Sequence, residues 1–93
     1  MGRYDNKIVL LCGCKGAADE ICKLICSEGA KVIVNDPDSE LTDAITAPVA
    51  EKMNLGTNME ETEKLVNSVI EKYETIHALI INYDEFKTAK KRS

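Results

Sequence analysis

The sequence predicts an α/β domain in which helices cover both faces of a parallel sheet, a three-layer αβα arrangement. Short apolar runs of strand length alternate along the chain with segments whose apolar residues recur at helical spacing. The runs are apolar at nearly every position, which is typical of strands buried on both faces. Strands that alternate with helices favour parallel pairing.

Composition excludes several classes of protein. The 93 residues are 44% hydrophobic and 30% charged, as expected for one small folded domain. The net charge of −4 argues against nucleic-acid binding. Apolar runs fall short of the roughly 20 residues that span a bilayer, so no membrane partner is expected. Residues 1–5 lack the apolar segment of a signal peptide, which makes the cytoplasm the expected location and reduced thiols the expected state of the four cysteines.

The first third of the chain predicts a strand, a helix and a second strand. Residues 7–12 (KIVLLC) form the first apolar run, and the loop 13–16 follows it directly. Residues 17–28 have helical periodicity, with Gly29 placed to end that helix. Residues 31–35 (KVIVN) are a second strand. The unit should have a right-handed crossover.

The pattern in the middle of the chain is weaker. A turn at 36–39 precedes one or two helical turns over 39–45. A short third strand is expected over 48–54, although Pro48 is unfavourable at its start.

The pattern becomes clear again in the last third. Residues 58–74 carry an apolar stripe every three to four positions, with charged residues on the opposite face. Residues 77–82 (HALIIN) are the last expected strand. Residues 84–93 form a basic tail.

Two stretches resemble short-chain dehydrogenases/reductases. KIVLLCGCKGAADEICKLICSEGAKVIVND is similar to the family's opening, in which a strand leads into Thr-Gly-x-x-x-Gly-x-Gly, a helix, Glu-Gly-Ala-x-Val and a strand ending in an acidic residue. TNMEETEKLVNSVIEKYETIHALIIN is similar to the next helix and strand, which in the family ends in Asn-Asn-Ala-Gly. Together they cover about two-thirds of the chain. The resemblance implies a Rossmann-like sheet of strand order 3-2-1-4, with residues 1–93 as a single incomplete domain.

The resemblance also implies cofactor-binding positions. Gly13 and Gly16 correspond to glycines that allow the dinucleotide to approach the backbone. Asp36 corresponds to the acidic residue that accepts hydrogen bonds from the adenosine ribose of NAD. Asn82 corresponds to the second asparagine of Asn-Asn-Ala-Gly. A turn or capping role is the simpler alternative for Asp36.

Several departures fall at these same positions. The spacing between the loop glycines is one residue short. Asp19 and Glu20 bring negative charge to the first turn of the helix, where a diphosphate would rest. Tyr83 replaces a small residue beside which the family's dinucleotide lies. We therefore expect either no bound cofactor or weakly bound NAD.

No catalytic residue is assigned. The family's catalytic serine and Tyr-x-x-x-Lys pair lie beyond the stretch that this chain matches, and the same spacing in 83–87 follows a strand and not a long helix, so it is interpreted as coincidence. The cysteines have neither zinc nor cluster spacing, and they are interpreted as small buried hydrophobes. His77 has no histidine partner and is interpreted as structural. No metal site is assigned.

These observations favour a degenerate, non-catalytic relative of the family. We expect it to act as a structural or regulatory subunit beside an active NAD-dependent alcohol or hydroxyacyl-CoA dehydrogenase subunit, because 77–82 would be an exposed apolar edge. The rest of a longer chain could cover that edge instead. One alternative is the cofactor half of a working NAD-dependent oxidoreductase. A second is a cysteine-based metal or redox module.

Overall fold

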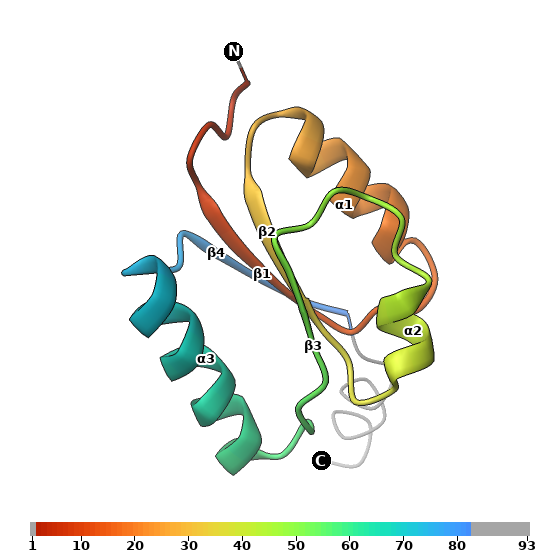
Figure 1. Ribbon diagram of the computed structural model, residues 1–93, viewed down its shortest axis with the longest axis vertical. Helices are drawn as coiled ribbons and strands as arrows, with labels where there is room; N and C mark the ends of the chain where they lie inside the picture. Colours follow the sequence, from red (N-terminus) through yellow and green to blue (C-terminus); the bar gives the residue numbers. More distant parts are fainter. Residues whose placement is uncertain (1, 83–93) are drawn as a thin grey trace, which may run out of the picture.

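The computed structural model describes residues 2–82, which form one four-stranded parallel sheet with helices on both faces (Figure 1). In chain order the elements are β1 (Ile8–Cys12), α1 (Ala18–Ser27), β2 (Lys31–Asn35), α2 (Ser39–Asp43), β3 (Glu51–Met53), α3 (Met59–Tyr73) and β4 (Ala78–Ile81). The strand order is β3-β2-β1-β4, which confirms the predicted Rossmann-like topology. The helices α1 and α2 lie on one side of the sheet and α3 on the other.

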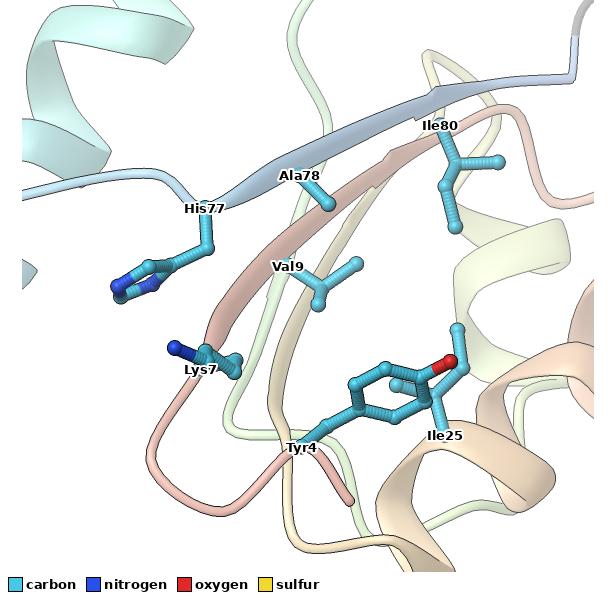
Figure 2. Close-up of a pocket in the computed structure, with 7 residues that line it drawn as sticks. All are labelled: Tyr4, Lys7, Val9, Ile25, His77, Ala78 and Ile80. Atoms are coloured by element: carbon cyan, nitrogen blue, oxygen red, sulfur yellow. The ribbon is translucent and has the colours of Figure 1, made fainter.

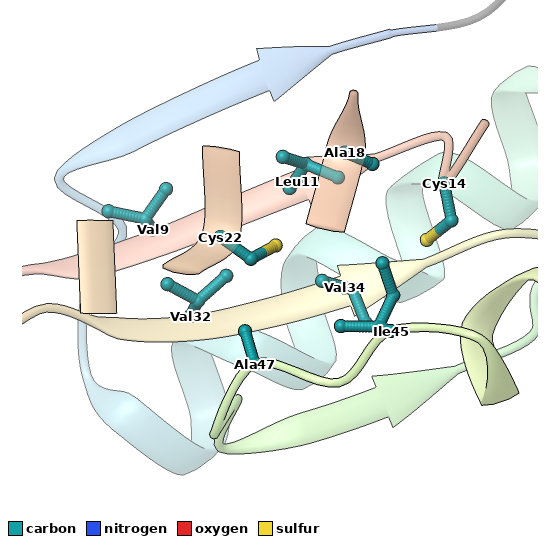
Figure 3. Close-up of a cluster of buried hydrophobic side chains, with 9 residues drawn as sticks. All are labelled: Val9, Leu11, Cys14, Ala18, Cys22, Val32, Val34, Ile45 and Ala47. Atoms are coloured by element: carbon teal, nitrogen blue, oxygen red, sulfur yellow. The ribbon is translucent and has the colours of Figure 1, made fainter. Parts of the chain in front are cut away.

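The sheet separates two hydrophobic cores. Because side chains alternate along a strand, β1 contributes to both, and all five of its residues are buried. The core beneath α1 includes the following side chains (Figure 3): Val9, Leu11, Cys14, Ala18, Cys22, Val32, Val34, Ile45 and Ala47. The core beneath α3 consists of Ile8, Leu10, Cys12, Ile33, Leu65 and Val69.

The ends of α3 are defined by capping. Asn58 begins the helix, where its side chain accepts a hydrogen bond from the backbone N–H of Glu61 at 2.8 Å. Glu74 ends it in the left-handed conformation, with φ at 74°. Glu51 at the start of β3 accepts from the Tyr73 hydroxyl at 2.9 Å and pairs with Lys72 at 3.0 Å. The three-residue strand β3 is thereby attached to the last turn of α3.

Strand β4 is an edge strand that the helices leave uncovered. The side chains of α3 reach β1, β2 and β3, and α1 packs over β1 and β2, so that in β4 only Ile80 packs at the margin of a core. As a result Leu79 is 50% exposed and Ile81 is 48% exposed. Parallel sheets are normally covered on both faces, so β4 is the incompletely buried part of this sheet.

Among the helices in residues 2–82, we find none with the length and apolar character needed to cross a membrane.

Replacement of Leu65 by alanine should destabilise the domain strongly. Leu65 is 1% exposed beneath α3, and truncation of such a side chain leaves a cavity that costs about 2–5 kcal/mol. Leu24→Ala on α1 is the matched control, because Leu24 is 64% exposed and its loss should change stability by less than about 0.5 kcal/mol. Urea unfolding measures both values. Equal effects of the two substitutions would contradict the assignment of this core.

Candidate nucleotide-binding edge

The carboxyl ends of three strands meet at one edge of the sheet. Cys12 lies opposite Asn35 in β2 and opposite Ile81 in β4, so the residues that follow these strands are neighbours. Ligands of open α/β sheets bind at this edge, where the direction of strand order reverses. The structure brings Gly13, Asp36 and Asn82 together here, with the loop 13–16 between them, and we call this region the carboxyl edge.

Asp36 holds the loop from the side of β2. Its Oδ2 accepts a hydrogen bond from the backbone N–H of Cys14 at 2.8 Å, and its Oδ1 accepts one from the N–H of Asp38 at 2.9 Å. The residue is only 6% exposed. Both carboxylate oxygens therefore already bind the protein's own backbone, and little of the residue is accessible to a ribose.

Asn82 holds the loop from the side of β4. Its side-chain amide donates to the carbonyl oxygen of Lys15 at 3.0 Å and, at 3.4 Å, to that of Gly13. Its backbone N–H donates to the Cys12 carbonyl at 2.7 Å. The side chain is therefore a clamp on the loop backbone.

The two loop glycines have conformations that other residues rarely adopt. Gly13 has φ of 98° and Gly16 has φ of 64°. A Cβ built on Gly16 would meet no atom within 4 Å, so conformation and not packing requires the glycine there. The residue before α1, Ala17, provides no side-chain cap. The loop backbone near Gly16 is thus the open part of the carboxyl edge.

The carboxylate of Asp19 lies away from this opening. Its Oδ1 accepts from the backbone N–H groups of Thr46 at 2.9 Å and Ala47 at 3.0 Å, and its Oδ2 accepts from the Thr46 hydroxyl at 2.7 Å. Lys23 lies 3.6 Å from the same oxygen. The sequence suggested that this carboxylate crowds the phosphate position. The structure shows that it joins α1 to the segment before β3 instead.

Two asparagines that sequence reasoning missed support the same edge. The buried Asn35 amide forms a pair of hydrogen bonds with the backbone of Leu55, at 2.8 and 3.2 Å. Asn54 donates to the Asp36 carbonyl at 2.9 Å and to the Thr42 hydroxyl at 3.0 Å. An asparagine at the end of an apolar strand was the available signal, since a buried amide needs partners.

Three of the four cysteines are buried in the two cores, and Cys26 is partly buried against one of them. Burial raises the pKa of Cys14 to about 12 and that of Cys22 to about 11, so both remain neutral thiols at neutral pH. Figure 3 shows them among aliphatic side chains. Within residues 2–82 we find no group of three or more His, Cys, Asp or Glu placed to hold a metal ion.

The remaining candidates from the sequence are His77, the Tyr83–Lys87 spacing and the basic tail. His77 Nδ1 accepts a hydrogen bond from the backbone N–H of Ile8 at 2.9 Å. The His77 side chain therefore links the start of β4 to β1. The Tyr83–Lys87 spacing and the basic tail at 84–93 lie outside the described residues.

Asp19→Ala should make the free energy of unfolding less dependent on pH in the acid range. The hydrogen bond from Thr46 is the main cause that lowers the pKa of Asp19 to about 2, from an ordinary value of 3.8. A depressed carboxyl pKa contributes stability above the unfolded-state pKa, and that contribution is lost as the pH falls from about 4 to about 2. Unfolding free energies of wild type and variant should therefore differ at pH 7 and converge near pH 2. Glu20→Ala, in the same helical turn, is the control, and a constant difference across this range would contradict the assignment.

Comparison with known proteins gives one informative result. No family model matches the sequence, and no match is found among curated proteins. Among solved structures, the fold is similar to the crystal structure of NAD+-bound xylitol dehydrogenase, with a TM-score of 0.73 and 20% sequence identity. The similarity covers 83% of this chain and 33% of that chain, so this chain spans about a third of its neighbour's length. The likeness shows a Rossmann-like fold.

Proposed function

We propose that this chain is a non-catalytic relative of the short-chain dehydrogenases/reductases. In this proposal it serves as a structural or regulatory subunit beside an active NAD-dependent alcohol or hydroxyacyl-CoA dehydrogenase subunit. The proposal rests on the hydrogen bonds that Asp36 and Asn82 make at the carboxyl edge. The side chains that a dinucleotide would need there already bind the protein's own backbone.

The hydrogen bonds of the carboxyl edge support a structural role. Asp36 binds two backbone N–H groups, and Asn82 binds the two carbonyl oxygens of the loop. A ribose or phosphate would have to compete with these contacts. Leaving a buried donor or acceptor unpaired costs about 1–3 kcal/mol, which would weaken any cofactor bound in this way.

The exposure of β4 supports a partner subunit. An uncharged edge strand with apolar side chains on both faces is a template for pairing with another chain. Leu79 and Ile81 are about half exposed, and the chain spans about a third of its structural neighbour. A partner that covers β4 would remove this apolar area from water.

One observation favours a second candidate, the cofactor half of a working NAD-dependent oxidoreductase. Gly16 is exposed and α1 begins without a side-chain cap, at the position where such folds receive a pyrophosphate. The structural neighbour was crystallised with NAD+. In this candidate the catalytic residues belong to a part of the protein outside these 93 residues.

Titration with NADH separates the two candidates. For the non-catalytic subunit we expect no saturable change in NADH fluorescence below roughly 1 mM, a binding free energy weaker than about 4 kcal/mol. Binding at micromolar NADH would overturn the proposal and support the second candidate. Asn82→Ala removes the hydrogen bonds to two loop carbonyls. If the loop does not bind NADH, this variant should also show no saturable change in NADH fluorescence.

The subunit role is tested by mixing the chain with an NAD-dependent dehydrogenase from the same cells and measuring mass by light scattering. We expect Leu79→Glu to abolish a mixed complex, because it places a charge on the exposed face of β4. Leu24→Glu, at a leucine of α1 that is 64% exposed, should leave the complex intact. A complex insensitive to Leu79→Glu would contradict a β4 interface.

A further inference from the structure

We propose that a slot between α1 and β4 binds an aliphatic monocarboxylate, with its chain on the sheet and its carboxylate at Lys7. The slot is a cavity of about 440 Å³ at the amino ends of β1 and β4 (Figure 2). Small-molecule sites commonly have volumes of about 300–1,000 Å³, with apolar walls and a few polar groups. The slot lies at the opposite ends of the strands from the carboxyl edge, so this inference is independent of the proposed function.

The floor of the slot lies at the margin of the core beneath α1, where Val9 is buried, Ile80 is partly buried and Ala78 is exposed. Val9 of β1 and Ala78 and Ile80 of β4 present only aliphatic groups to it. Because α1 does not extend over β4, this surface is open at the place where a parallel sheet would normally be covered. It can therefore hold an alkyl chain.

The opposite wall is formed by Tyr4 and Ile25. The backbone N–H of Tyr4 donates to the Glu28 carbonyl at 2.8 Å, and its carbonyl accepts from the N–H of Lys7 at 2.9 Å. These bonds hold the segment before β1 against the end of α1. Figure 2 shows the Tyr4 ring beside Ile25 and across from Val9, so the slot has two apolar sides.

One end of the slot carries positive charge. Lys7 is exposed, and within residues 2–82 it forms no ion pair. His77 lies beside it, and because its Nδ1 accepts the Ile8 N–H, the neutral ring carries its hydrogen on Nε2. An unpaired ammonium group next to an apolar floor selects a ligand with one anionic head and an aliphatic body.

A second groove, which has no charged lining residue, shows why the charge of Lys7 determines the class of ligand. It has a volume of about 410 Å³ on the other face of β4, between that strand and α3, and includes Leu79 and Ile81. Its lining residues are apolar or neutral, with no charged side chain. It offers hydrophobic contact but nothing to recognise a head group, so the proposal concerns only the slot at Lys7.

The test is a titration of the full 93-residue chain with hexanoate, octanoate and decanoate, followed by amide chemical shifts. We expect saturable shifts confined to the residues around the slot, and affinity that rises about three- to fourfold with each added methylene. Decanol should bind up to about fivefold more weakly than decanoate, since it lacks the charge that pairs with the exposed Lys7.

Lys7→Gln tests the charge at the end of the slot, and Ala78→Leu tests the space within it. Lys7→Gln should reduce decanoate affinity to that of decanol, whereas Lys31→Gln, at the equivalent start of β2, should not change it. Ala78→Leu should fill the slot and abolish binding, and an unchanged circular dichroism spectrum would show that the fold is intact. The proposal would be overturned by equal binding of decanol and decanoate, by an unaffected Lys7→Gln, by shifts only in the groove beneath α3, or by self-association that covers the slot.

Discussion

The burial of β1 on both faces is the constraint on which the rest of the structure depends. This strand pairs with β2 on one side and β4 on the other, and its side chains enter both hydrophobic cores. Such a strand can exist only if helices cover each face, because a half-covered parallel strand would expose apolar side chains. The helix α1 satisfies this requirement on one face and α3 on the other.

The same arrangement explains how the polar residues of the carboxyl edge are used. Parallel strands end together, so the loop after β1 lies between the residues that follow β2 and β4. Its backbone groups need partners, since buried N–H and C=O groups are rarely left unpaired. Asp36 and Asn82 supply those partners. A carboxylate and an amide in positions suited to a cofactor are thus explained by the needs of the loop, which is why we favour a non-catalytic role.

Incomplete coverage of β4 links the two remaining inferences. The sheet has apolar side chains on both faces of this strand, yet only Ile80 packs against the core beneath α1, and Leu79 and Ile81 stay about half exposed. The edge of β4 is therefore suited to pairing with another chain. Its face beneath Tyr4 is suited to a small amphiphile, because Lys7 adds a charge at one end. The two occupants use different surfaces: the partner uses the strand edge and the face that carries Leu79, and the amphiphile uses the opposite face, which carries Ala78 and Ile80.

The sequence by itself determined the elements and their order. Five of the seven elements lie within the residues where a clear apolar pattern predicts them, because periodicity is a local property that the residues carry themselves. The short α2 and β3 lie within the ranges expected for them, where the pattern is weak. Only the tertiary structure decided the partners of polar side chains. Asp19 bonds to Thr46 and Ala47, more than 25 residues away, and Asn82 bonds to Lys15, 67 residues away. Such contacts depend on the register of strands and on the path of a loop, which no local pattern encodes. For that reason the carboxylate expected at the phosphate position faces another segment.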